Sequence, residues 1–143
     1  MGHLKIAALL HEAGILKVKA EEAVDTGLSK PFFPHGLGHH LGLQVHDVAG
    51  KQLGPDGEFK PSPAEHPFLR TTRVIEEGQV FTVEPGLYFI PHQLDQWRAE
   101  GRFAEFIDYD ALERFRHFGG IRIEDDVLIT DAGARVLGPP IPK

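Results

Sequence analysis

Residues 33–47 have the most distinctive composition of the chain, and they read FPHGLGHHLGLQVHD. Four of the nine histidines of the chain lie in this stretch, at positions 35, 39, 40 and 46. Imidazole is the commonest metal ligand in proteins and the usual proton carrier near neutral pH. The glycines between the histidines permit tight turns and the close approach of a ligand. The pattern favours a metal or substrate site over the alternative, a glycine-rich loop with surface histidines.

A second stretch, residues 80–88, reads VFTVEPGLY. Side chains alternate between the two faces of a strand, so Val80, Thr82 and Glu84 share one face. A carboxylate at the end of an apolar strand is costly unless it is paired or bound to a cation. Glu84 is therefore a candidate metal ligand, although this stretch alone also fits an exposed glutamate at a strand end.

A third stretch, residues 118–127, reads FGGIRIEDDV. The same alternation predicts that Arg122, Glu124 and Asp126 share one face. This fits a metal-binding carboxylate beside an anion-binding guanidinium, and it also fits an ion pair on a solvated face. Together the three stretches supply nitrogen and oxygen ligands of the kind that manganese, zinc and cobalt ions accept.

The composition is that of a globular protein of one domain. The 143 residues are 41% hydrophobic and 25% charged, which excludes a disordered or fibrous chain. The net charge is −6 and basic residues form no run, so nucleic-acid binding is not expected. No stretch reaches the roughly 20 apolar residues of a membrane span. Cysteine is absent and no targeting signal is recognised, so the cytoplasm is the expected location.

Hydrophobic periodicity and the positions of proline and glycine predict the order of elements. An apolar stripe formed by Ile6, Leu9, Leu10 and Ala13 predicts the first helix, with Gly14 as its stop signal. The predicted elements are helices over 3–13 and 20–26, non-helical segments over 29–47 and 50–67, strands over 79–90 and 120–130, a helical or irregular stretch over 94–118 and an extended tail over 138–143.

The three stretches resemble bacterial Xaa-Pro dipeptidases (prolidases), which are pita-bread metallopeptidases. The matching text is FFPHGLGHHLGLQVHDVAG from Phe32, LRTTRVIEEGQVFTVEPGLYFI from Leu69 and RFRHFGGIRIEDDVLIT from Arg114. The resemblance implies an α+β fold, the C-terminal half of a pita-bread (creatinase/aminopeptidase-like) domain, with helices on one face of a curved, mainly antiparallel sheet. It also implies that residues 1–143 form a single partial catalytic domain, without the N-terminal domain and the first half of the catalytic domain.

The resemblance implies a centre of two divalent metal ions, with manganese as the expected metal and cobalt or zinc as alternatives. His39 and Glu84 match metal ligands, and Glu84 is also a candidate catalytic base. Glu124 matches a carboxylate that bridges both metals. The family uses two further aspartate ligands upstream of the first stretch, whereas Asp25 is the only aspartate before His39 here. The metal site of this chain is therefore expected to be incomplete.

The resemblance also implies a dipeptide substrate with a C-terminal proline. His46 matches the catalytic histidine that donates a hydrogen bond to the substrate and stabilises the tetrahedral intermediate. His35 matches a second histidine that faces the substrate. Arg70 and Arg122 match guanidinium groups that hold the carboxylate of the proline, a pairing that fixes the end of a dipeptide.

The expected function is hydrolysis of Xaa-Pro dipeptides by the intact parent protein, with the truncated chain itself nearly inactive. Two alternatives remain open. One is a degenerate relative that binds a partner or peptide without catalysis, and the other is a parent that acts mainly as an organophosphorus acid anhydrolase. The uncovered face of a half sheet also predicts association, either as a homodimer or with the missing N-terminal half.

Overall fold

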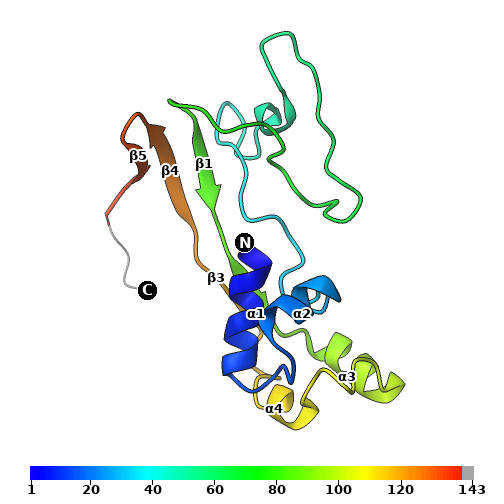
Figure 1. The fold of residues 1–143 in the computed structure, drawn as a ribbon. Helices are drawn as coiled ribbons and strands as arrows, with labels where there is room; N and C mark the ends of the chain where they lie inside the picture. Colours follow the sequence, from blue (N-terminus) through cyan, green and yellow to red (C-terminus); the bar gives the residue numbers. More distant parts are fainter. Residues whose placement is uncertain (140–143) are drawn as a thin grey trace. The chain divides into compact units, whose positions relative to one another are not determined.

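The computed structural model describes residues 1–139, which divide into two compact units (Figure 1). The first unit consists of residues 1–34 and 86–122, and the second begins at residue 35, runs to residue 85 and resumes at residue 123. The elements of the first unit are α1 (Gly2–Glu12), α2 (Ala20–Asp25), β2 (Gly86–Tyr88), α3 (Pro91–Glu100), α4 (Tyr109–Glu113) and β3 (Gly120–Arg122). Those of the second unit are the 3₁₀ helix η1 (Val48–Lys51), β1 (Val80–Val83), β4 (Asp125–Thr130) and β5 (Gly133–Val136).

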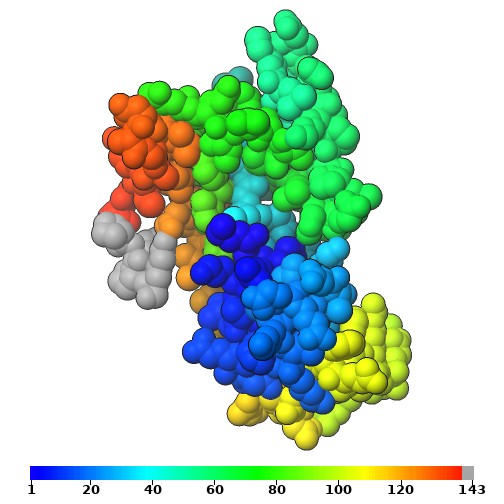
Figure 2. Space-filling view, viewed as in Figure 1, coloured from blue at the N-terminus to red at the C-terminus, as the bar shows by residue number. Residues whose placement is uncertain are grey.

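The two predicted N-terminal helices are confirmed as α1 and α2, which pack against each other, and their surface atoms adjoin in Figure 2. Gly14 adopts the left-handed conformation that ends α1, with φ at 73°, and the chain folds back so that Ile15 is buried. The predicted apolar stripe is partly wrong. Ile6 and Leu10 are buried, but the third buried position is Ala7, while Leu9 and Ala13 face water.

Aromatic side chains hold the core of the first unit. Phe32 meets Phe89 and Trp97 edge to face, at ring-centroid distances of 5.9 and 5.8 Å. Phe89 also stacks on Phe115. The antiparallel pair of β2 and β3 is continuous with this core, because the residue after β2 is Phe89. The first unit is therefore a helical cluster built around a short hairpin-like ladder.

The second unit contains a three-stranded antiparallel sheet in the order β1–β4–β5. Val80 pairs with Leu128 and Val83 with Asp125, which fixes the register of β1 against β4. The other edge of β1 is lined by residues 37–41, whose backbone bonds to β1 through three hydrogen bonds of 2.7 to 3.0 Å. This register is what positions the candidate site described below.

Both predicted strands are interrupted once. Residues 79–90 form β1 and β2 with a break at Glu84–Pro85, because proline has no N–H for a ladder. Residues 120–130 form β3 and β4 with a break at Ile123–Glu124, where Ile123 N–H bonds to the Pro85 carbonyl at 3.3 Å. Glu124 thus lies in the break between β3 and β4, outside the strand that carries Arg122, and the sharing of a face by this pair stays a prediction.

Three further comparisons with the sequence predictions concern the loops and the ends of the chain. Residues 50–67 are largely irregular as predicted, apart from the end of η1 and an isolated bridge between Gln52 and Phe59. Strand β5 was not predicted. The predicted extended tail falls outside the described residues from position 140 on. Among residues 1–139, no helix has the length and apolarity that crossing a bilayer requires.

Two neighbouring leucines of α1 provide a test of the core. Leu10 is 1% exposed and Leu9 is 53% exposed. We expect Leu10→Ala to lower the free energy of unfolding by about 2–5 kcal/mol, because it leaves a cavity in the core. Leu9→Ala carries the same change of residue type in the same helix and should cost less than about 1 kcal/mol. Urea denaturation of both variants measures the difference, and equal losses would contradict this packing.

Candidate metal centre

The strand register brings two glutamates side by side. In an antiparallel pair the end of one strand lies beside the start of the other, and here Val83 pairs with Asp125. Glu84 directly follows β1 and Glu124 directly precedes β4. The pairing that forms the sheet therefore also juxtaposes these two carboxylates.

A histidine reaches the same place from the opposite edge of β1. The backbone of residues 37–41 runs antiparallel to β1, with Thr82 N–H bonded to the His39 carbonyl at 2.9 Å and Glu84 N–H to the Leu37 carbonyl at 2.7 Å. Gly38 lies against β1 so closely that a Cβ atom there would collide with the Thr82 carbonyl oxygen. Glycine at position 38 is therefore what allows His39 to approach the strand.

His39, Glu84 and Glu124 each offer a ligand atom, and these atoms all lie within 4.8 Å of one another. Two ligands of one metal ion with bonds of about 2.1 Å lie at most about 4.2 Å apart, so these atoms would draw slightly closer around a bound ion. His39 is 3% exposed and Glu84 8% exposed, whereas Glu124 lies at the surface. Within residues 1–139, this is the only group of three or more potential ligands so arranged.

The histidine ring is oriented for metal binding. Nδ1 of His39 lies 3.1 Å from the carbonyl oxygen of His40, and because a carbonyl can only accept, Nδ1 carries the proton in this bond. In the neutral ring, Nε2 then turns its lone pair toward Oε1 of Glu84, 3.5 Å away. Two acceptors that face each other need a positive charge between them, which a proton or a divalent cation supplies. The donor set therefore fits a metal ion.

Comparison with known proteins agrees with this geometry. A sequence model of the metallopeptidase family M24 matches residues 3–131. The chain belongs to metallopeptidase family M24. The predicted resemblance and the predicted α+β class of the pita-bread proteins are thus confirmed, and the chain is a member of a family of metal-dependent hydrolases.

Individual M24 relatives are much longer than this chain. It is 52% identical over 130 residues to a Xaa-Pro dipeptidase of Proteus mirabilis, an alignment that covers 90% of this chain and 29% of the relative. It is 50% identical over 139 residues to a Xaa-Pro dipeptidase of Xanthomonas axonopodis pv. citri, covering 97% and 31%. The solved structure of zinc-substituted E. coli aminopeptidase P in complex with product matches with a TM-score of 0.62 and 36% identity, covering 94% of this chain and 23% of the other.

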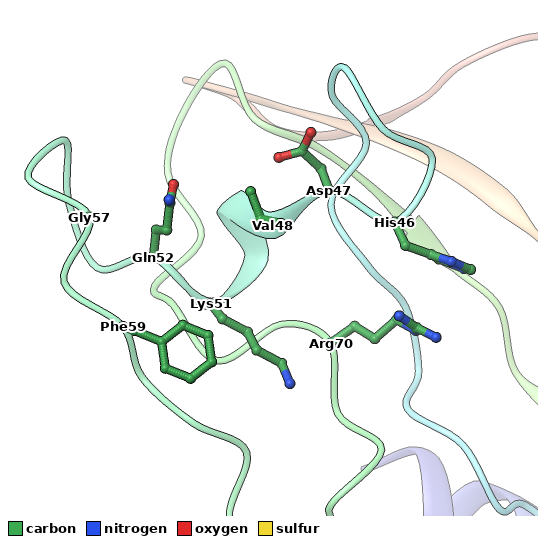
Figure 3. A pocket seen from close by; sticks show the side chains of 8 residues that line it. All are labelled: His46, Asp47, Val48, Lys51, Gln52, Gly57, Phe59 and Arg70. Carbon is green, nitrogen blue, oxygen red and sulfur yellow. The ribbon is translucent and has the colours of Figure 1, made fainter.

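A pocket of about 340 Å³ contains two of the predicted substrate-binding residues, His46 and Arg70 (Figure 3). Figure 3 shows their side chains extending in the same direction from two different segments, with Lys51 and Phe59 along the wall. The ring of His46 also lies 4.3 Å from the ring of His39, centroid to centroid. The pocket therefore adjoins the candidate cluster of His39, Glu84 and Glu124 through His46.

Charged groups near His46 both raise and lower the pKa of its ring. Its pKa is lowered below the ordinary value for histidine, first because the ring is partly removed from water and then because Arg70 and His39 lie nearby. Glu84 and Glu124 oppose this shift by favouring the charged ring. The balance favours a neutral imidazole near neutral pH.

The remaining predicted residues lie in different surroundings. His35 is half-buried, and its Nδ1 lies 2.8 Å from the Gly36 carbonyl oxygen. Arg122 is exposed at the end of β3, in the first unit, whereas the other predicted site residues belong to the second. Asp25, the only aspartate before His39, ends α2 in the first unit.

Sequence reasoning overlooked Thr82 and Asp47. The alternation had placed Thr82 on the same face as Glu84 without a role, and a polar residue inside an apolar strand was the available signal. Asp47 accepts hydrogen bonds from the N–H groups of Ala49 at 2.9 Å and Gln44 at 3.2 Å. Its carboxylate therefore closes the loop that carries His46.

Gly38 offers a direct test of the approach of His39 to β1. We expect Gly38→Ala to destabilise the protein by about 1–3 kcal/mol, because the added methyl group meets a backbone oxygen that cannot turn aside. Gly54→Ala is the matched control, since a Cβ atom there meets nothing within 4 Å. Thermal melting and divalent-metal titration of both variants measure the effect, and tolerance of Gly38→Ala in both assays would contradict the geometry.

The role of Asp47 can be tested by mutation and by pH. The N–H groups of Ala49 and then of Gln44 hold the pKa of Asp47 below its ordinary value. The carboxylate therefore stabilises the loop above the unfolded pKa of 3.8, and this contribution is lost as the pH falls through the lower folded pKa. We expect Asp47→Ala to lower the protection factor of the Ala49 amide against hydrogen exchange at neutral pH, and we expect the same protection factor to fall in the unmodified chain when acid protonates Asp47. Asp56→Ala in the neighbouring loop should leave this protection factor unchanged.

Proposed function

We propose that this chain carries part of the active site of a metal-dependent Xaa-Pro dipeptidase, in a protein that supplies the rest of the catalytic domain. The convergence of His39, Glu84 and Glu124 within 4.8 Å carries the proposal. Support comes from membership of family M24 and from relatives named Xaa-Pro dipeptidase at 52% and 50% identity. Residues 1–143 are, in this proposal, a single partial catalytic domain.

His39, Glu84 and Glu124 are the proposed metal ligands, and manganese is the proposed metal. A mixture of one imidazole and two carboxylates suits manganese, and it also accepts cobalt or zinc. Bound divalent metal ions lower the pKa of water and polarise a carbonyl group, which is the chemistry that peptide hydrolysis requires. Two further aspartates, which the prolidase resemblance implies, belong in this proposal to the part of the catalytic domain that the chain lacks.

The neighbouring residues bind and orient the substrate. His46, beside His39 and on the pocket wall, donates a hydrogen bond to the carbonyl oxygen before proline as negative charge develops there. Glu84 is the proposed base, and one of its carboxylate oxygens accepts a proton from the water that adds to this carbonyl carbon. The Xaa-Pro bond is a tertiary amide, so its nitrogen must be protonated before proline leaves, and Glu84 can return the proton that it accepted.

Specificity for a C-terminal proline is assigned to the guanidinium groups. Arg70 extends beside His46 in the same pocket and can hold the proline carboxylate by paired hydrogen bonds. Arg122 and His35 are proposed to complete substrate binding, on the strength of the prolidase resemblance. A carboxylate held in this way fixes the length of the substrate, because a longer peptide has no charged group at that position.

The chain spans 29% and 31% of the length of the two Xaa-Pro dipeptidases compared above. We propose that the isolated chain is nearly inactive, since each missing carboxylate removes a metal–ligand bond and a charge that neutralises the cations. A cytoplasmic location is part of the proposal, supported by the absence of cysteine.

A chimera tests the function directly. In the Proteus mirabilis Xaa-Pro dipeptidase, the matching segment is replaced by this chain, and hydrolysis of Ala-Pro is measured with added Mn(II). We expect the chimera to cleave Ala-Pro and to cleave Ala-Pro-Ala far more slowly, while the 143-residue chain alone shows at most a trace of activity. A folded chimera that binds metal but cleaves no Xaa-Pro dipeptide would contradict the proposed function. Rapid turnover by the isolated chain would contradict the proposal that this chain alone is nearly inactive.

Glu84→Gln and Glu77→Gln form a matched pair of variants that tests the role of Glu84. Glu84→Gln keeps the shape of the side chain but removes its charge, so the activity of the chimera should fall more than about a hundredfold, together with its metal content. Glu77→Gln makes the same change at an exposed position and should leave both unchanged. Metal content measured after gel filtration provides a second readout that does not depend on turnover.

A further inference from the structure

We propose that Thr82 is a positioning residue that fixes His39 and Glu84 relative to each other, an inference that rests on the metal site of the proposed function. Thr82 lies in β1, two residues before Glu84, and is 1% exposed. Its side chain bonds to both segments that carry the buried candidate ligands.

The contacts of the Thr82 hydroxyl have a defined direction. The backbone N–H of His39 can only donate, so Oγ1 of Thr82 accepts that bond, at 3.0 Å. The single proton of the hydroxyl is then available for Oε1 of Glu84, which lies 3.2 Å away. One hydroxyl therefore uses its acceptor on one ligand residue and its donor on the other.

The same oxygen of Glu84 faces Nε2 of His39, at 3.5 Å. Thr82 thus holds the carboxylate oxygen that is nearest to the histidine ring. Because the hydroxyl proton occupies one lone pair of Oε1, the carboxylate cannot rotate freely about its last bond. The bond to Thr82 therefore sets which lone pair of Oε1 remains directed toward a shared cation.

The surroundings of Thr82 leave water little access to replace this arrangement. The residue is buried, and the backbone of Gly38 is packed against the Thr82 carbonyl. Replacing the hydroxyl by a methyl group would leave the His39 N–H without its acceptor in a buried position. Valine has nearly the shape of threonine, so Thr82→Val removes the two hydrogen bonds while it preserves the packing of β1.

The test is metal binding by the chimera described above, in which the rest of the catalytic domain is present. Mn(II) is titrated and the free ion is followed by electron paramagnetic resonance. We expect Thr82→Val to weaken Mn(II) binding about tenfold or more, as is typical when a residue that orients a metal ligand is lost. Thr82→Ser keeps the hydroxyl and should restore affinity to within about threefold of the unmodified chimera. Rescue by serine separates positioning from packing, because serine packs worse than valine.

A second readout does not involve metal. In the metal-free protein, Thr82→Val should speed hydrogen exchange of the His39 amide and shift its ¹⁵N–¹H resonance, and Thr82→Ser should do neither. Thr130→Val is the matched control, because the Thr130 hydroxyl bonds to the Gly133 carbonyl at 3.0 Å at the far end of β4. This control should leave Mn(II) affinity and His39 exchange unchanged.

The outcomes separate the two proposals. Unchanged Mn(II) affinity in a folded Thr82→Val chimera overturns the positioning role and leaves the metal site standing. Failure of the unmodified, folded chimera to bind Mn(II) contradicts the proposed function and overturns the positioning role with it. If valine prevents folding, Thr82→Ala replaces it in the same comparison with serine, with the same expected loss.

Discussion

The antiparallel register between β1 and β4 is the constraint on which the candidate site depends. Val83 opposes Asp125, so the residue after β1 and the residue before β4 are brought together by backbone hydrogen bonds rather than by attraction between their side chains. Two carboxylates repel each other, and only a stronger, local set of interactions can hold them close. A shift of one residue in the register between β1 and β4 would turn Glu84 to the opposite face and separate it from the other two side chains of the cluster.

The third ligand depends on a different kind of contact. Residues 37–41 lie beside β1 like an additional strand, and within this segment His40 forms an antiparallel bridge with Phe81. The segment can lie there because Gly38 has no side chain, and the bond from Nδ1 to the His40 carbonyl turns the His39 ring. Backbone packing thus places the imidazole, and one further hydrogen bond chooses which of its nitrogens faces the glutamates.

Much of this could be read from the sequence, and the failures have physical causes. Alternation correctly grouped Thr82 with Glu84, whose side chains are joined by a hydrogen bond of 3.2 Å although β1 ends at Val83. It did not predict the break between Arg122 and Glu124, because Ile123 bonds there to Pro85, a partner nearly forty residues away in the chain. Strand β5 was not predicted because its four residues are all exposed and carry no alternating pattern. The three candidate ligands were assigned by resemblance, whereas the two hydrogen bonds through Thr82 depend on distances that no local pattern encodes.

The order of the ligands along the polypeptide has a consequence for biosynthesis. His39 is synthesised first of the three, Glu84 later and Glu124 last. A nascent chain on the ribosome therefore exposes a histidine and a glutamate well before the β4 partner exists to complete the sheet. Since such long-range pairing forms slowly compared with local structure, the three side chains converge only after β4 has been synthesised and paired.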